Sequence, residues 1–181
     1  RKLEEFISLL ESKYSESGYY NATFTPNIAI DSQNRAGINL VVKQGDRVKI
    51  ESFKISGAEK ISEPSLLKLF KIGEADMFFL NYFTNKDLFT EAEFKQGIDL
   101  MTNAYFDSGY LDFQILSIDS SLDDNKEKIA IEINISEGIQ YQLGKISFEG
   151  ETEVIGIEAL EKAISMNEGD IFNRNLVIND I

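Results

Sequence analysis

Carboxylates are the most prominent reactive side chains in this sequence. Glu91 and Glu93 form the best-spaced pair, and acid–base catalysis by two carboxylates needs one pKa raised by burial. A helix would place the two on different faces, and Thr90-Glu-Ala-Glu93 has the spacing of a helix-capping box, which already explains both acids. We therefore expect neither to be catalytic.

A run of acidic residues from Asp119 to Asp124 has the composition of a calcium-binding loop. It lacks the glycine and the terminal bidentate glutamate of such a loop, so we expect a solvated turn. The sequence has no histidine and no cysteine, which removes the commonest general base and the usual transition-metal ligands. We therefore expect a protein that is not an enzyme and has no catalytic residue, cofactor or metal site.

The length and charge of the chain limit its fold and partners. Its 181 residues, 43% of them hydrophobic, suit one ordinary domain or two small ones with a real core. The 18 basic and 31 acidic residues give a net charge of −13, which repels phosphate backbones and anionic membranes. No apolar run approaches the roughly 20 residues of a membrane-spanning helix. Nucleic acid is not an expected partner.

An internal repeat organises the chain. The sequence YSESGY, which begins at Tyr14, recurs as YFDSGY from Tyr105, 91 residues later. A second segment, which begins at Gly45, matches one that begins at Gly138, 93 residues later. We divide the chain into the end of one unit (1–46), a complete unit (47–139) and the start of a third (140–181), joined by short hinges at Gly45-Asp46 and Gly138-Ile139.

Each unit is predicted to follow the order strand, helix, helix, strand, strand. In the complete unit, β-forming residues predict the first strand over 48–56. Ser62 can cap the first helix and Thr90 the second, which Gly109 ends. We expect an α+β fold in which each unit has a three-stranded mixed sheet packed on two helices. The last strand should be central and the middle strand should lie at an edge.

The middle strand of each unit has the features of a sheet edge. In the first unit it contains Pro26, which lacks an N–H and is tolerated in sheets mainly on edge strands. In the complete unit Phe113 and Ile115 are followed by Leu116 and Ile118 on the opposite parity, so one residue has been inserted. A β-bulge would explain this insertion, and bulges favour edges.

An open edge can accept an extended chain as an additional strand with little demand on its sequence. Leu116 and Ile118 are either exposed contacts on this edge or core residues redirected by the bulge, and the sequence leaves both interpretations open. Leu122, beside two aspartates at the hairpin tip, is our favoured exposed apolar contact. The candidate polypeptide-binding residues are Asp112, Gln114, Leu116, Ser117, Ile118, Ser120 and Leu122.

The long connection between the two helices is rich in aromatic residues. Loops of this length are functional or disordered more often than not. Aromatic residues at this density also cover a domain's own core, so self-packing and partner binding both stay open. The possible secondary contacts are Phe78, Phe79, Tyr82 and Phe83.

The order of the elements, the Gly-Tyr pair that closes the second helix, the last strand ending in Glu137-Gly138 and a first strand of the form Phe-x-Ile-x-Gly together resemble the POTRA family. The resemblance covers essentially the whole chain. The aromatic connection is similar to an insertion in the third POTRA domain of outer-membrane assembly factors, which places the three parts in the second, third and fourth domains. Gly57-Ala58 and Gly150-Glu151 depart from the Gly-Asn that usually follows the first strand.

The resemblance implies a role in outer-membrane protein assembly. It implies an array on the periplasmic side of the Gram-negative outer membrane, attached to a membrane β-barrel that lies outside this chain. Its partners would be unfolded outer-membrane β-barrel proteins and accessory lipoproteins, with membrane contact only through that barrel. The alternatives are a passive spacer, or a docking arm of a related two-partner secretion or autotransporter assembly protein.

Overall fold

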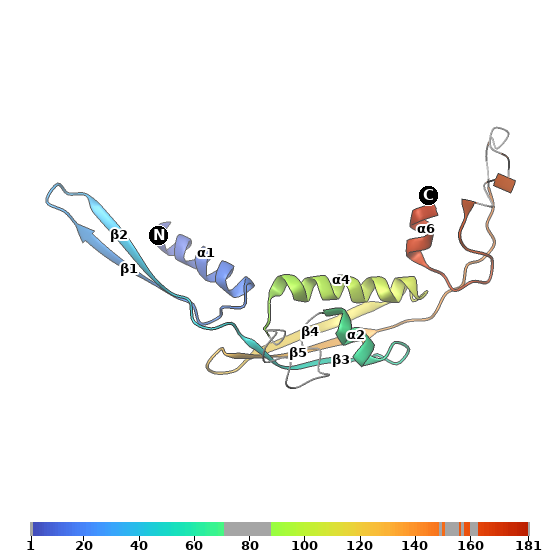
Figure 1. Cartoon of the computed structure of the whole chain (residues 1–181), viewed down its shortest axis with the longest axis horizontal. Helices are drawn as coiled ribbons and strands as arrows, with labels where there is room; N and C mark the ends of the chain where they lie inside the picture. The colour runs from blue at the N-terminus through green and yellow to red at the C-terminus, as the bar shows by residue number, and fades with distance from the viewer. Residues whose placement is uncertain are drawn as a thin grey trace.

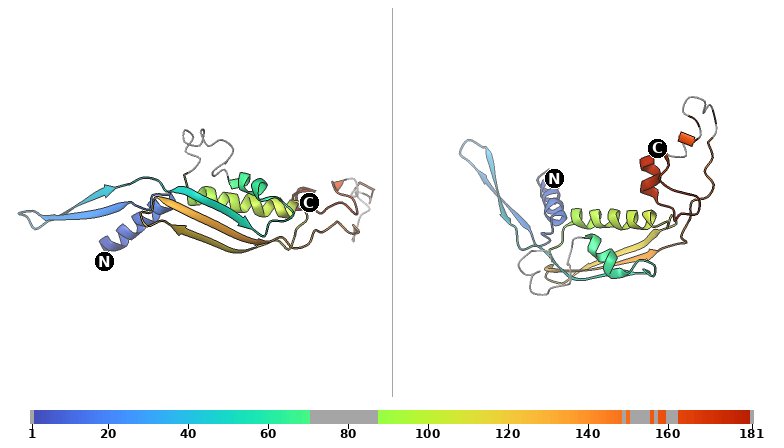
Figure 2. Two further views of the ribbon diagram at one scale, coloured as in Figure 1. Left: turned by 90° about the horizontal axis from the view of Figure 1, so that it is seen from below. Right: turned by 45° about the vertical axis from the view of Figure 1, so that its right-hand side comes forward.

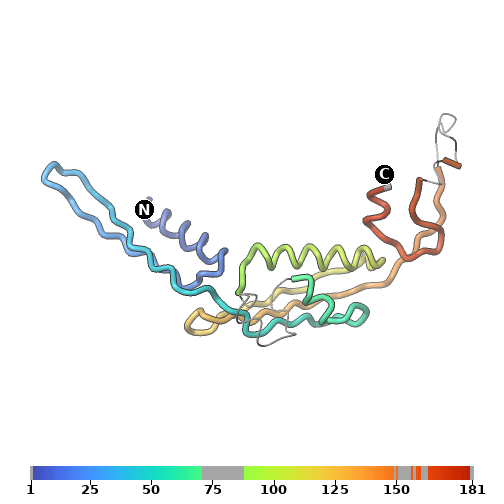
Figure 3. Tube along the Cα trace, viewed as in Figure 1, coloured from blue at the N-terminus to red at the C-terminus, as the bar shows by residue number. Residues whose placement is uncertain are grey.

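The computed structural model describes residues 2–70, 88–148, 150, 156, 158–159 and 163–180. The chain is elongated, and its parts follow one another along the long axis (Figures 1 and 3). A two-stranded hairpin with one helix comes first, a three-stranded sheet with its helices lies in the middle, and the C-terminal part follows at the other end. None of the helices in the described residues is long and apolar enough to cross a membrane.

The middle part contains a three-stranded mixed sheet. β3 (Lys49–Ser56) runs parallel to β5 (Lys128–Ser136), and β4 (Gln114–Leu122) runs antiparallel to β5 on its other side. The strand order is therefore β3-β5-β4. This order confirms that the last strand of the unit is central and that the middle strand lies at an edge.

Two helical segments pack on one face of this sheet (Figure 2). α2 (Glu63–Leu67) continues into the short 3-10 helix η1 (Lys68–Phe70), and α4 (Glu91–Asp107) follows the connection. β5 turns four isoleucines, each 0–4% exposed, toward these helices. The core that the helices share with the sheet includes Leu66, Phe70, Met101, Tyr105, Ile131 and Ile133.

The two helices begin differently. Thr90 caps α4 as predicted, because its hydroxyl oxygen accepts a hydrogen bond from the N–H of Glu93 at 3.3 Å and its hydroxyl donates to the Glu93 carboxylate at 2.8 Å. Ser62 lies at the N-cap position of α2, but its side chain does not cap the backbone and instead pairs with the Ser65 hydroxyl at 2.8 Å. The predicted side-chain cap is therefore wrong there. Pro64 lies in the first turn of this helix, where a residue without an N–H leaves one donor fewer to satisfy.

The first part holds α1 (Lys2–Glu16) and an antiparallel hairpin of β1 (Thr23–Ile30) and β2 (Ala36–Lys43). The two strands of this hairpin pair in one continuous register. In the middle part, the register of β4 on β5 shifts between Ile115 and Ser117, which leaves Leu116 as the additional residue. The bulge predicted from the change of parity is confirmed.

The C-terminal part includes α6 (Arg174–Asp180). The side-chain oxygen of Asn173 accepts a hydrogen bond from the N–H of Leu176 at 3.0 Å. Thr90 makes the same i to i+3 bond at the start of α4. α6 and α4 therefore begin with the same kind of side-chain cap.

Candidate polypeptide-binding edge

β4 forms one of the two edges of the middle sheet, and β3 forms the other. Among the described residues β4 pairs with β5 alone, so one side of its backbone has no strand beside it. An edge of this kind presents a row of N–H and C=O groups to any chain that approaches. The residues whose backbone groups point outward therefore decide what the edge can bind.

The hydrogen-bond pattern of the hairpin identifies these residues. The N–H of Asp123 bonds to the carbonyl of Lys128 at 3.0 Å, so this pair is of the hydrogen-bonded type. Hydrogen-bonded and non-hydrogen-bonded pairs alternate along an antiparallel ladder. The pairs that Leu122, Ser120 and Ile118 form with β5 are therefore of the non-hydrogen-bonded type, and the backbone groups of these three residues point away from β5.

Pro26 in β1 supports this assignment. In the first hairpin the N–H of Asp31 bonds to the carbonyl of Arg35 at 3.0 Å, and the same alternation places Pro26 opposite Leu40 in a non-hydrogen-bonded pair. An N–H at this position would point outward, so the ladder loses nothing by having proline there. Ile118 holds the equivalent place in β4.

The bulge leaves two apolar side chains exposed. Leu116 is 63% exposed and Ile118 is 45% exposed, so they are surface residues and not redirected core residues. Leu122 behaves in the opposite way, because it is half-buried and packs against the core. It lies opposite Ile129 and so shares the helix-covered face of the sheet. The expectation that Leu122 is an exposed contact at the hairpin tip is therefore wrong.

The opposite face of β4 is polar. The side-chain amide of Asn134 donates to Ser117 Oγ at 3.0 Å, and the Ser117 hydroxyl donates to the Asp119 carboxylate at 2.9 Å. Ile118 lies on the other face, opposite Ile133. The edge therefore has an apolar side and an acidic, hydrogen-bonding side.

The two candidates that precede the bulge have different surroundings. Gln114 is exposed and pairs with Ser136 at the start of the strand. The carboxylate of Asp112 accepts a hydrogen bond from the Tyr141 hydroxyl at 2.8 Å. Asp112 therefore joins the following part of the chain, which leaves it less available to a bound polypeptide.

The remaining candidates lie at the hairpin tip and in the helix connection. The Asp123 carboxylate accepts hydrogen bonds from the N–H groups of Glu127 and Lys128, as the predicted turn would require. Phe89, at the end of the aromatic connection, is 6% exposed and belongs to the core, so this residue packs on its own domain. Four aromatic candidates lie outside the described residues: Phe78, Phe79, Tyr82 and Phe83.

A buried carboxylate, Glu137, fixes the loop between β3 and α2 and was not predicted as a structural centre. It accepts hydrogen bonds from the N–H of Lys60 at 2.9 Å, the N–H of Ile61 at 3.3 Å and the hydroxyl of Tyr105 at 2.8 Å. Burial acts to raise the pKa of Glu137, but these hydrogen bonds outweigh it, and the pKa is lowered. Burial and the bond to Glu137 raise the pKa of Tyr105. The Glu137-Gly138 pair was the visible signal, but its partners come from distant elements that no local pattern connects.

Comparison with models of protein families assigns this chain to a family. A model of the POTRA family, described as "Surface antigen variable number repeat", matches residues 48–138, about half of the chain. The chain belongs to the POTRA family.

Curated proteins similar to this chain include outer membrane protein assembly factors named BamA. The chain is 28% identical over 172 residues to BamA of Neisseria meningitidis serogroup B, an alignment that covers 95% of this chain and 21% of that protein. It is 23% identical over 151 residues to BamA of Buchnera aphidicola, covering 82% of this chain and 24% of that protein. Each alignment thus spans less than a quarter of the curated relative.

A solved structure shows the same fold. The crystal structure of Haemophilus influenzae BamA POTRA3-5 superposes with a TM-score of 0.55 at 18% identity, covering 99% of this chain and 67% of that one.

Proposed function

We propose that this chain is part of the periplasmic arm of an outer-membrane protein assembly factor and that it binds unfolded β-barrel proteins by adding their strands to β4. The names of its relatives support a role in outer-membrane protein assembly. One observation carries the binding mode: β4 is an open edge with outward backbone groups at Ile118, Ser120 and Leu122.

The same proposal gives the array its order and its other partners. It assigns residues 1–46, 47–139 and 140–181 to the second, third and fourth domains of the arm. Accessory lipoproteins would dock on the folded surface of these domains, and contact with the membrane would come only through a β-barrel outside this chain. The role is binding and scaffolding without catalysis.

An added strand would meet different chemistry on its two faces. Its residues on the helix side would lie next to Ile118, and those on the other side next to Asp119 and Ser117. Apolar residues alternating with polar or cationic residues would suit both faces. Strands of membrane β-barrels have such an alternation, with apolar residues toward lipid and polar residues inside. The edge therefore suits many barrel strands without selecting one sequence.

The strength of such binding follows from main-chain hydrogen bonds. Each contributes a net ~0.5–1.5 kcal/mol, and ordering an extended chain offsets part of this gain. Three outward residues supply only a handful of bonds. Capture would therefore be weak and reversible, as transfer of clients along an array requires.

Photocrosslinking in the complete assembly factor tests the proposal, with the photoreactive group at Ile118. Ser120→Pro removes an outward N–H, whereas Ser120→Ala removes the hydroxyl and keeps that donor. We expect the proline variant to lose most of its crosslinking to an unfolded outer-membrane β-barrel protein and the alanine variant to keep it. Circular dichroism checks that both variants are folded.

Equal crosslinking in the two folded variants would contradict strand addition at β4. Crosslinks to folded accessory proteins alone would favour the second function, a passive spacer or the docking arm of a related two-partner secretion or autotransporter assembly protein.

A further inference from the structure

Main-chain hydrogen bonds connect the first part of the chain to the middle unit. The carbonyl of Gly18, which follows α1, accepts a bond from the N–H of Val48 at 2.8 Å. The carbonyl of Val48 accepts a bond from the N–H of Phe89, just before α4, at 3.0 Å. Lys49 and Leu88 beside them form an isolated antiparallel bridge. Val48, which is fully buried, therefore links the helix of one unit to the second helix of the next.

The second junction contains the same arrangement. The carbonyl of Gly109, which follows α4, accepts a bond from the N–H of Tyr141 at 2.8 Å. The carbonyl of Tyr141 accepts a bond from the N–H of Phe172, just before α6, at 3.0 Å. Gln142 and Ile171 form the corresponding isolated bridge.

The intervals between equivalent residues show that the joint is kept while the sequence around it changes. Gly109 lies 91 residues after Gly18, and Tyr141 lies 93 residues after Val48. The third pair, Phe89 and Phe172, is only 83 residues apart, because the connection that precedes α6 is ten residues shorter than the one that precedes α4. The same bonds form in spite of this difference in length.

Glycine is required at the first position of each joint. Gly18 has φ +87° and Gly109 has φ +84°, in the left-handed region that other residues rarely adopt. A Cβ on Gly18 would lie 2.2 Å from the carbonyl oxygen of Phe89, and one on Gly109 would lie 2.8 Å from that of Tyr141. Both obstacles are backbone atoms of the next unit, so no side chain can move aside to make room.

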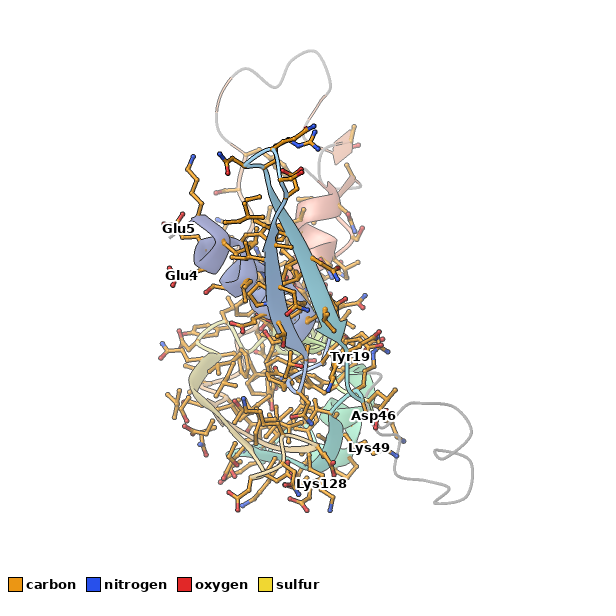
Figure 4. All side chains as sticks on the ribbon, turned by 90° about the vertical axis from the view of Figure 1, so that its left-hand side faces the viewer. Glu4, Glu5, Tyr19, Asp46, Lys49 and Lys128 are labelled. Carbon is orange, nitrogen blue, oxygen red and sulfur yellow. The ribbon has the colours of Figure 1, made fainter. Side chains whose placement is uncertain are left out.

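Side chains add contacts to the first joint. Tyr20 packs against the core of the middle unit, and the guanidinium of Arg47 lies 5.5 Å over the ring of Tyr19. Figure 4 shows Tyr19 and Asp46 where the hairpin meets the middle unit, and both line a cavity of about 600 Å³ with Lys128. The two parts therefore meet through side chains as well as through backbone.

The second joint has its own side-chain contacts. The Tyr141 hydroxyl donates to Asp112 at 2.8 Å, and the side-chain amide of Asn175 donates to Asp107 at 2.6 Å. The backbone N–H of Asn175 also donates to Asp107, at 3.2 Å. The contacts differ from those of the first joint, but they connect the same elements.

We propose that the two junctions are one repeated joint that holds neighbouring units at a fixed rotation. The array would then be a regular screw that presents the edge strands β1 and β4 at a set spacing. Domains joined by small interfaces move by default, which was the reason to expect hinges at Gly45-Asp46 and Gly138-Ile139. Here the groups that meet are main-chain atoms in close contact, and rotation about either hinge would break the bonds of Val48 or Tyr141.

Distances between spin labels across each joint test this proposal. The chain has no cysteine, so introduced cysteines can be labelled selectively. Labels at Asn39 and Asn103 span the first joint, labels at Asn103 and Asn179 span the second, and labels at Asn103 and Ser121 give a reference inside the middle unit; all four residues are exposed. In an array with complete flanking units, we expect distance distributions across both joints to be as narrow as the reference.

Alanine variants of the two joint glycines test whether each glycine keeps its own joint rigid. Gly18→Ala should broaden only the first distribution and Gly109→Ala only the second. Gly37→Ala and Gly144→Ala are matched controls, because a Cβ on Gly37 meets only a carbonyl oxygen at 3.8 Å and one on Gly144 meets nothing within 4 Å. If Gly109→Ala loses the reference distance, Asp107→Ala replaces it at the second joint; it removes the bonds to Asn175 without backbone strain and should broaden the second distribution.

Broad distance distributions across the unmodified joints would overturn the proposal and would indicate flexible hinges. So would equal effects of Gly18→Ala and Gly37→Ala, or an unchanged second distribution in Asp107→Ala. None of these measurements involves a client polypeptide, so the result is independent of the function proposed for β4.

Discussion

The hairpins β1–β2 and β4–β5 share a strand pattern but differ in burial. Ile38 and Ile131 hold equivalent places 93 residues apart, yet Ile38 is 55% exposed and Ile131 is 3% exposed. Alternation of apolar and polar residues therefore marks a face of a strand without deciding whether that face is buried. In the middle unit β3 pairs with β5 and two helices cover the sheet, whereas among the described residues β2 has only β1 beside it. Burial comes from elements that are distant in sequence.

Alanine at these two isoleucines should give the largest difference in stability between the two hairpins. We expect Ile131→Ala to lower the free energy of unfolding by about 2–5 kcal/mol, because it leaves a cavity in a core that relaxes only partly. Ile38→Ala should change it by less than about 0.5 kcal/mol. Urea unfolding followed by circular dichroism measures both values. Similar losses would mean that the first hairpin is as well covered in solution as the second.

Gln44 and Glu137 hold equivalent places, 93 residues apart in the repeat. The side chain of Gln44 is exposed, whereas the carboxylate of Glu137 is buried. The donors of Lys60, Ile61 and Tyr105 converge on Oε1 of Glu137, and the Lys60 N–H also donates to Oε2 at 3.0 Å. In Glu137→Gln the amide oxygen can keep the Oε1 position, but the NH₂ group then takes the Oε2 position and faces the Lys60 N–H. We expect a loss of about 1–3 kcal/mol at neutral pH, because one buried N–H then faces another donor and the remaining hydrogen bonds lose their charged acceptor. Gln44→Ala is the control and should have almost no effect on urea unfolding.

The pH dependence of the stability of Glu137→Gln tests whether the charge of Glu137 stabilises the fold. The pKa of Glu137 is lowered in the folded chain, so its ionised form stabilises the fold at pH values above the unfolded pKa of about 4.3. That stabilisation is lost as the pH falls through the folded pKa. The difference in stability between the original chain and Glu137→Gln should therefore shrink in acid. A difference that stays constant from neutral to acid pH would show that the charge of Glu137 is not what holds the loop.

The helices α1 and α4 differ at another equivalent position. Phe6 in α1 is 51% exposed, whereas Gly97 in α4 is buried, and a Cβ on Gly97 would lie 2.1 Å from Cδ1 of Phe70. We expect Gly97→Ala to destabilise the chain by about 1 kcal/mol in net, because overpacking of about 1–3 kcal/mol exceeds the gain of about 1 kcal/mol in helix propensity. The exposed Asn103→Ala should show the propensity gain alone. Thermal unfolding compares the two, and a stabilised Gly97→Ala would contradict the tight packing on Phe70.

Local patterns predicted the parts of this fold that depend on neighbouring residues. The repeat gave the order of elements, Thr90 gave the start of α4, and the change of parity gave the bulge at Leu116. The burial of Leu122 could not be predicted in this way, because it depends on the pairing with Ile129 that follows the bulge.

The network of Glu137 and the two joints were also hidden from local patterns, since their partners lie tens of residues away. The edge itself was predictable from Pro26 and the bulge. The direction of each N–H along that edge was not, because it requires the register of the ladder.

Proline at two adjacent serines tests this direction. The N–H of Ser120 points outward, as an N–H at Pro26 would, so Ser120→Pro should change stability by less than about 1 kcal/mol. Ser121 pairs with Ala130 in a hydrogen-bonded position, so Ser121→Pro removes a ladder bond and should cost about 1–3 kcal/mol.

The two variants make the same change of residue type at exposed positions, so only the direction of the lost N–H distinguishes them. Amide exchange in the original chain gives an independent reading, because the N–H of Ser120 should exchange faster than that of Ser121. The outward groups of β4 would belong to the other set of residues if Ser120→Pro were the more damaging variant, or if the N–H of Ser120 in the original chain were more protected than that of Ser121. Strand addition would then have to use Ser117, Asp119 and Ser121, with the acidic face of the sheet beside the residues that pair.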